Sequence, residues 1–145
     1  MKILNKKEKA QIIEELENYG IEQPNYLFLE TGREKIRGYS GNLSRDELAN
    51  LERNLRVEII GLFLFRKEKE GLRLSLDACH LLKPKNKILE INNEQAELWM
   101  KGQDLQLSTD LKGFVIIKNK DNFLGCGKVA ENKILNFIPK ERRTK

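Results

Sequence analysis

The chain has 145 residues, of which 34% are charged and 7% aromatic, and its formal net charge is +5. This length can bury a hydrophobic core without disulfides, in one domain or in two small ones. No apolar run approaches the ~20 residues that cross a bilayer, and the N-terminus lacks a signal-peptide core, so we expect a cytoplasmic protein with no membrane partner.

The first elements expected are a helix and a hairpin. Apolar residues at helical spacing predict an amphipathic helix over 6–19, which Gly20 ends, and 26–29 reads as a buried strand. Residues 31–42 have two readings. The first is a β-hairpin that turns at Thr31-Gly32 into a strand over 35–39. The second is a loop in which Arg33, Lys35 and Arg37 hold a phosphate beside Tyr39; both readings can hold together.

The middle of the chain repeats this alternation of helix and strand. Ser44 is a good N-cap, with Glu47 at the capping-box offset, for a helix that runs to about Asn54. The almost wholly apolar run 57–65 predicts a central strand that is covered on both faces. The elements expected next are a charged hairpin tip over 66–70, a strand over 71–76 and a short helix over 77–82.

A polar segment broken by Pro84, residues 83–87, is the best linker candidate, so we place a boundary between domains at 1–84 and 85–145. Beyond it we expect a strand over 88–91, a helix over 93–101, and an antiparallel meander over 114–118, 123–130 and 133–138. Gly125 and Gly127 within the meander predict a bulge, a bend or a closely passing backbone, as a small curved barrel requires.

The positive charge is concentrated at the C-terminal end. Residues 112–145 contain nine basic and three acidic residues, a net charge of +6 that exceeds the +5 of the whole chain. Such local basicity is typical of a nucleic-acid footprint.

Four short motifs in this segment carry a resemblance: Lys112-Gly113-Phe114, Leu124-Gly125-Cys126-Gly127-Lys128, the run from Asn136 to Lys140, and Arg142-Arg143. In order and spacing they resemble the closing segment of the Sun-type RNA cytosine-5 methyltransferases, which ends in a PUA-type RNA-binding module. The likeness covers roughly residues 40 to 143. The family usually has tryptophan at Cys126 and lysine at Leu135.

The resemblance implies an α+β fold, in which an N-terminal α/β domain with a small mixed sheet precedes a PUA-like β-barrel. The catalytic domain of the family is missing from this sequence. Its own residues also lack the glycine-rich turn between strand and helix, the acidic ribose ligand and the recognisable thiolate that such a reaction needs. His80 is the only imidazole, and Cys79 and Cys126 have no metal spacing, so we expect no enzyme, no cofactor and no metal.

The leading hypothesis is a stand-alone protein that binds structured RNA, either tRNA or rRNA. It would serve an RNA-modifying enzyme as an accessory or specificity subunit, or a ribosomal particle as an assembly factor in ribosome biogenesis. The candidate RNA-binding residues are Lys112, Gly113, Lys118, Gly125, Gly127, Lys128, Lys133, Asn136, Lys140, Arg142 and Arg143.

The alternative is a protein-protein interaction adaptor whose basic C-terminus only keeps it soluble. Convergence of Lys112, Lys128, Lys133 and Lys140 on one face would favour RNA binding, and scatter would favour the adaptor. A degenerate enzyme with a cleft near Cys126 or His80 is a third reading.

Overall fold

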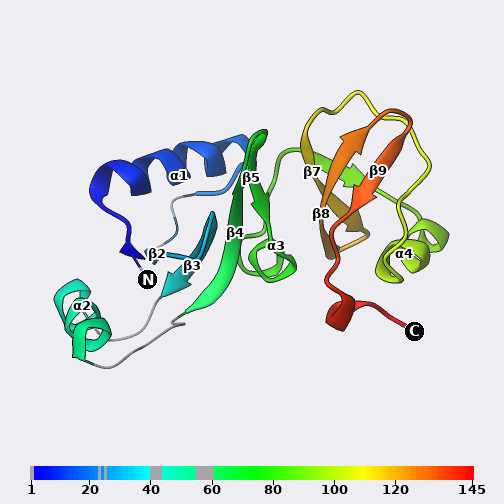
Figure 1. Cartoon of the computed structure of the whole chain (residues 1–145). Helices are drawn as coiled ribbons and strands as arrows, with labels where there is room; N and C mark the ends of the chain where they lie inside the picture. The colour runs from blue at the N-terminus through cyan, green and yellow to red at the C-terminus, as the bar shows by residue number, and fades with distance from the viewer. Residues whose placement is uncertain (1, 23, 25, 40–43, 55–60) are drawn as a thin grey trace.

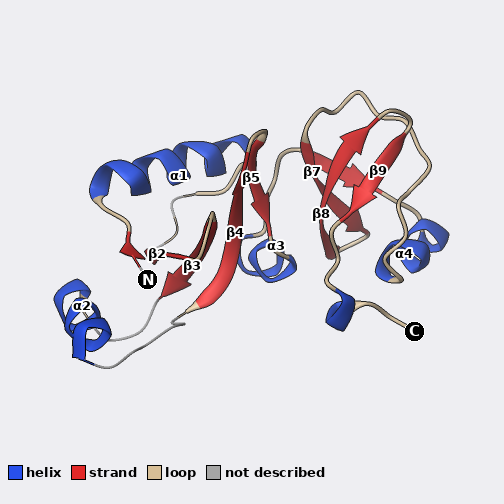
Figure 2. Cartoon of the chain, viewed as in Figure 1, coloured by secondary structure: helices blue, strands red, loops and turns tan. Residues whose placement is uncertain are grey.

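The computed structural model describes residues 2–22, 24, 26–39, 44–54 and 61–145. Within these residues the chain forms two sheets, four α-helices and one 3-10 helix (Figure 1). The α+β class is confirmed. The helix α3 lies between the two sheets (Figure 2).

The first sheet has the order β1-β2-β3-β4-β5. Its strands are β1 (Lys2–Ile3), β2 (Leu27–Thr31), β3 (Lys35–Tyr39), β4 (Leu62–Glu68) and β5 (Gly71–Leu74). All four pairings are antiparallel, whereas the sequence predicted a mixed sheet here. The mixed sheet is the second one, where α4 provides the crossover that a parallel pair of strands requires.

Three helices accompany the first sheet: α1 (Lys6–Asn18), α2 (Arg45–Asn54) and α3 (Leu76–Leu82). Asn5 and Glu8 form a reciprocal capping box at the start of α1. Ser44 and Glu47 form the predicted one before α2. Helix α1 packs its buried Ile12 and Leu16 against one face of the sheet.

The turn between β4 and β5 differs from the prediction. Residues 57–60 of the expected apolar strand lie outside the described residues, and β4 runs on through Arg66 to Glu68. The register pairs Glu68 with Gly71, so the turn consists of Lys69 and Glu70. The charged residues at 66–68 therefore belong to the sheet and not to its hairpin tip.

The second sheet has the order β6-β7-β8-β9. Its strands are β6 (Ile88–Glu90), β7 (Phe114–Asn119), β8 (Asn122–Ala130) and β9 (Lys133–Asn136), with α4 (Asn93–Met100) between β6 and β7 and η1 (Lys140–Arg142) after β9. The predicted meander β7-β8-β9 is confirmed. An isolated bridge joins Leu105 to Ile134, and the strand pairing among the described residues is that of an open sheet.

The predicted bulge lies in β8. Ile116 pairs with Cys126 and Lys118 with Phe123, so Leu124 and Gly125 together oppose Ile117. Gly125 has φ +97°, a conformation that side chains disfavour, which explains the glycine.

The two faces of the second sheet enter different cores. Phe114, Ile116 and Cys126 join the cluster that also contains Leu16 and Leu74 of the first half. On the other face, residues such as Val115, Ile117 and Ile134 pack around the fully buried Trp99. The first of these cores is therefore shared across the predicted boundary at residue 84.

Candidate functional site

Three cationic side chains occupy directly opposed positions on adjacent strands. Lys35 of β3 pairs with Arg66 of β4, and Arg66 pairs with Arg73 of β5. We call these three residues the cationic row. Like charges directly opposite one another destabilise a sheet. Glu68 offsets part of this charge, but at 3.7 Å from Arg66 Nε and 3.6 Å from Arg73 Nη2 it makes long ion pairs.

The cationic row lies on the sheet face that α1 leaves free. Its strand neighbours Ile36, Phe65 and Leu74 alternate with it and are buried in the core that includes α1. A register shift beside Ile36 and Arg37 returns Phe63 to the side of Lys35, whose Nζ lies 5.9 Å from the centroid of the Phe63 ring.

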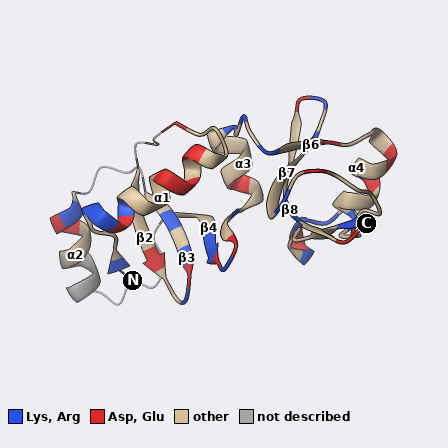
Figure 3. Cartoon of the chain, turned by 90° about the horizontal axis from the view of Figure 1, so that it is seen from above, with Lys and Arg blue, Asp and Glu red and all other residues tan. Residues whose placement is uncertain are grey.

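The opposite side of the same sheet is acidic beside the second half of α1, whereas the first turn of this helix carries Lys6, Lys7 and Lys9. A groove of about 440 Å³ between α1 and the β4-β5 hairpin is lined by Glu8, Glu14, Glu15 and Glu68 with one lysine, Lys67. Acidic residues occupy much of the second half of α1 in Figure 3. The sheet face beside the second half of α1 is therefore acidic, whereas the face of the cationic row is basic.

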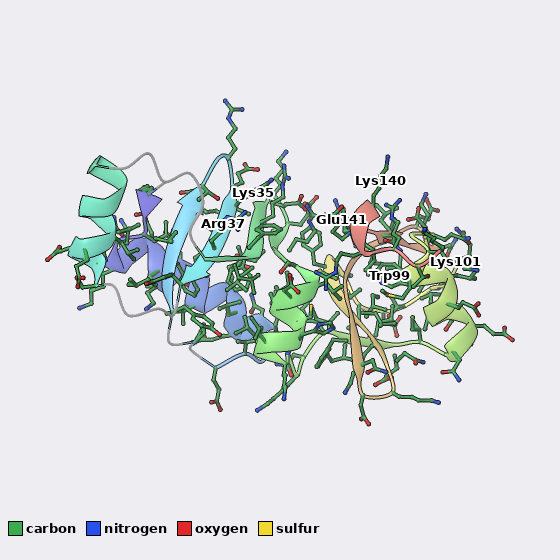
Figure 4. The ribbon with its side chains drawn as sticks, turned by 90° about the horizontal axis from the view of Figure 1, so that it is seen from below. Lys35, Arg37, Trp99, Lys101, Lys140 and Glu141 are labelled. Atoms are coloured by element: carbon green, nitrogen blue, oxygen red, sulfur yellow. The ribbon has the colours of Figure 1, made fainter. Side chains whose placement is uncertain are left out.

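A cleft of about 390 Å³ begins at the cationic row and ends at the C-terminal segment. Besides the row, the charged residues that line it are Arg142, Asp77 and Glu141, which leaves an excess of two positive charges. Figure 4 shows Lys35 on β3 and Glu141 on η1 at the two sides, and Lys140 extending beside Glu141. The cleft thus combines side chains from the two halves of the chain.

Arg73 connects the row to the second sheet. Its guanidinium carbon lies 4.2 Å from the centroid of the Phe137 ring, a cation–π contact. Its Nε is buried and makes no hydrogen bond to any described residue. A buried donor without an acceptor is unfavourable, so Arg73 is held by stacking and by its long ion pair and not by a full set of hydrogen bonds.

The four lysines whose convergence was in question do not all lie at one end of the second sheet. Lys112 precedes β7 and Lys133 begins β9, at the end of the sheet where Lys128 pairs with Phe114. Lys140 lies beyond the opposite end of β9, in η1. The Lys128 ammonium is 2.8 Å from the Glu70 carboxylate and lowers the pKa of Glu70.

The other predicted cations are also spread out. Lys118 lies at the hairpin end of β7, 5.3 Å above the Phe123 ring. Arg142 contacts both carboxylate oxygens of Asp77 at 3.3 Å and lines the cleft. Arg143 donates from Nε to the carbonyl of Ile138 and packs against Gly102.

The predicted non-cationic residues have structural partners. The Asn136 amide donates to the carbonyls of Trp99 and Gln103 and accepts from the Ile138 amide, so it joins β9 to the end of α4. Gly127 leaves room for Ile134 and Trp99. Gly113 has φ +71°, and its carbonyl accepts from Val129.

Cys126 lines the cleft, whereas His80 is not among its lining residues. Burial raises the pKa of Cys126 to about 12, so at neutral pH it is a thiol and not the thiolate that a nucleophile requires. The exposed His80 is part of α3, and its Nε2 donates to the Phe123 carbonyl of β8 at 2.8 Å. It is the ordinary hydrogen-bonded histidine that the sequence predicted.

A family model for the PUA domain of the methyltransferase RsmF matches residues 86–144. The match covers the C-terminal part of the chain, which is therefore similar to this PUA domain. We call the matched residues the PUA domain. They comprise the second sheet, α4 and η1, together with Arg142 and the other residues that form the C-terminal wall of the cleft.

Curated relatives extend the similarity upstream. Ribosomal RNA small subunit methyltransferase F of Shewanella oneidensis is 30% identical over 128 residues, which is 86% of this chain and 26% of the relative. The protein of the same name from Aliivibrio fischeri is 33% identical over 89 residues, 60% of this chain and 19% of the relative. The chain thus spans about a quarter or less of these relatives.

One solved structure shares the fold over nearly the whole chain. A conserved PUA domain protein from Thermoplasma acidophilum matches with a TM-score of 0.64 at 16% identity, covering 94% of this chain and 92% of that chain. The first sheet and the PUA domain therefore recur together in one known architecture.

Sequence reasoning missed Arg66 and Arg73 as site residues. The predicted hairpin tip at 66–70 excludes Arg66 from the sheet, and therefore also its pairing with Arg73. A two-residue turn at Lys69-Glu70 would have given this register from the sequence, because antiparallel partners lie at equal distances from a tight turn.

Proposed function

We propose that the protein binds RNA along the face that carries the cationic row and the cleft. The observation that supports this most strongly is the row itself: three opposed cations on adjacent strands, facing away from α1. An RNA backbone would neutralise this charge, because its phosphates are the anions that lysine and arginine rows bind.

Structured ribosomal RNA is the substrate class we propose, with tRNA as the second class to be tested. A relative named ribosomal RNA small subunit methyltransferase F is 30% identical over 128 residues, which include parts of both halves of this chain. In this proposal the protein positions RNA and catalyses no reaction itself. It would act as a specificity component of an rRNA-modifying enzyme, or in ribosome assembly, in the cytoplasm.

The test is binding of a labelled small-subunit rRNA fragment, and of total tRNA, at several salt concentrations. Four double variants each remove two positive charges: Lys35→Gln with Arg66→Gln, Lys140→Gln with Arg142→Gln, Lys112→Gln with Lys133→Gln, and Lys6→Gln with Lys7→Gln. The last pair is the matched control, because it lies in the first turn of α1 on the other side of the sheet.

We expect the first two doubles to weaken binding and to reduce the slope of log affinity against log salt by roughly 0.7 for each phosphate that the variant no longer neutralises. The control double should keep the wild-type slope. The Lys112 and Lys133 double tests the footprint that the sequence predicted. If all four double variants lose affinity equally, net charge alone explains the effect. That result would contradict a specific binding face.

The adaptor interpretation makes the opposite prediction. The scatter of Lys112, Lys133 and Lys140 over both ends of β9 is the observation that favours it. If the wild-type protein binds neither RNA at low salt, the RNA proposal fails and the adaptor interpretation replaces it.

A further inference from the structure

We infer that the cleft holds a single nucleotide that has left the RNA stack, with its phosphate on the cationic row and its base in the interior of the cleft. This inference rests on the proposed function and specifies which part of the RNA the cleft takes. The volume of about 390 Å³ falls within the ~300–1,000 Å³ typical of small-molecule sites.

The lining of the cleft is partly charged and partly apolar. Lys35, Arg66 and Arg73 supply the cationic part, while the half-buried Phe63, Leu76 and Phe137 supply apolar surface. A nucleotide has the same division, a dianionic or monoanionic phosphate joined to a flat base with apolar faces. A phosphate alone would leave the apolar part unused, and an apolar peptide would bury the cations without partners.

Arg73 is the residue best placed to hold both parts. Its guanidinium stacks on Phe137 at 4.2 Å, and it lines the cleft itself. A base stacked on a guanidinium plane is a recurring mode of single-stranded RNA recognition, and here it would extend the Phe137–Arg73 stack. The phosphate would then contact the cationic row, to which Arg73 belongs.

Glu141 gives the cleft a means of distinguishing bases. It lies on the wall opposite Lys35, and Figure 4 places it on η1 beside Lys140. A carboxylate accepts hydrogen bonds from the exocyclic amine of cytosine, which uracil lacks. We therefore expect the cleft to prefer cytidine over uridine nucleotides.

The experiment is a titration of the ¹⁵N-labelled full chain followed by NMR. The ligands are CMP, UMP, cytidine, inorganic phosphate and a short polyglutamate peptide. The signals that report the cleft are the Arg73 Nε–H and the backbone amides of Gly125 and Cys126. Signals of residues 112 and 133 report the other end of the sheet.

We expect CMP to shift the cleft signals. Cytidine and phosphate should each bind at least about ten-fold more weakly, because each has only one of the two parts that the cleft holds. Arg66→Gln should weaken CMP binding by about ten-fold, and Lys6→Gln should not change it. Glu141→Gln should remove the preference for CMP over UMP. Dispersed spectra of each variant verify that it is folded.

Two outcomes would overturn the inference, and a third would remove only the role of Glu141 in base preference. Phosphate or polyglutamate binding as tightly as CMP would make the cleft a general anion site. If CMP shifts only the signals of residues 112 and 133, the nucleotide binds at that end of the sheet and not in the cleft. The proposal of RNA binding would be unaffected. A preference for CMP that survives Glu141→Gln would remove the role of Glu141. Conversely, if CMP binds in the cleft but the protein binds no RNA, only the proposed function is contradicted.

Discussion

Gly127 shows how tightly single positions are constrained in the PUA domain. A Cβ built at this residue would lie 2.6 Å from Ile134 Cγ2 and 2.9 Å from Trp99 Cη2. We predict that Gly127→Ala destabilises the protein by about 1–3 kcal/mol, the usual effect of overpacking a core. Urea unfolding of the variant and of the wild-type protein measures this difference.

A double-mutant cycle with Ile134→Ala isolates the cause. Ile134→Ala removes the Cγ2 atom that the new methyl group would meet, so the two changes together should cost less than the sum of their separate costs. Additive costs would mean that the contact with Ile134 does not explain the glycine.

The buried thiols make stability depend on alkaline pH. Burial raises the pKa of Cys126 from 9.0 to about 12, and it raises the pKa of Cys79 as well. The folded state then keeps a proton that the unfolded chain releases, so raising the pH favours unfolding. The stabilisation is complete below about pH 9 and is lost between about pH 9 and pH 12, at up to ~1.4 kcal/mol per pH unit for each thiol.

We predict that Cys126→Ala makes this alkaline decline shallower, although it also lowers stability at pH 7 because it removes buried packing. Urea unfolding at pH 7, 9 and 10.5 checks the prediction. An unchanged decline in the variant would mean that Cys126 does not ionise differently in the folded and unfolded states.

At the scale of elements, the cationic row implies a compromise between stability and binding. Arg66 faces Lys35 on one side and Arg73 on the other, and each opposed like-charge pair costs roughly 0.2–1 kcal/mol. We predict that Arg66→Gln keeps or raises the free energy of unfolding by up to about 1 kcal/mol at low salt while it weakens RNA binding.

Salt provides the control for this prediction. The gain in stability should shrink as salt is added, because screening weakens the repulsion in the wild-type protein. A decrease of more than about 1 kcal/mol would show instead that the long Arg66–Glu68 ion pair outweighs the repulsion.

The elements that the sequence predicted well are those with local signals. The capping box at Ser44, periodic apolar residues and the glycine stop fix α1, α2, the β2-β3 hairpin and the meander within a few residues. The cleft has no such signal. Arg73 contacts Phe137, which lies 64 residues later in the sequence. This contact depends on how the two sheets pack, and residue spacing does not reveal that packing.

At the scale of the whole molecule, the shared core predicts cooperative unfolding. Leu16 of α1 is fully buried in the cluster that includes Phe114, Ile116 and Cys126 of the PUA domain. The predicted boundary at residue 84 therefore divides the sequence, but buried residues from both sides of it share one hydrophobic core. Weaker packing on one side should destabilise the other.

We predict that Leu16→Ala, a change that typically costs 2–5 kcal/mol, shifts the unfolding transition observed through Trp99 fluorescence. Trp99 is the only tryptophan in the chain and lies in the PUA domain, so its emission reports the half that does not contain the mutation. The transition should coincide with that observed by far-UV circular dichroism, as expected for a single cooperative unit.

Leu98→Ala is the control: Leu98 adjoins Trp99 but is 43% exposed, so its removal should move the curve little. If Leu16→Ala leaves the Trp99 transition in place, the two halves unfold independently. The cleft would then be held together by Arg73 and its neighbours alone, and RNA would have to stabilise the arrangement of the two sheets on binding.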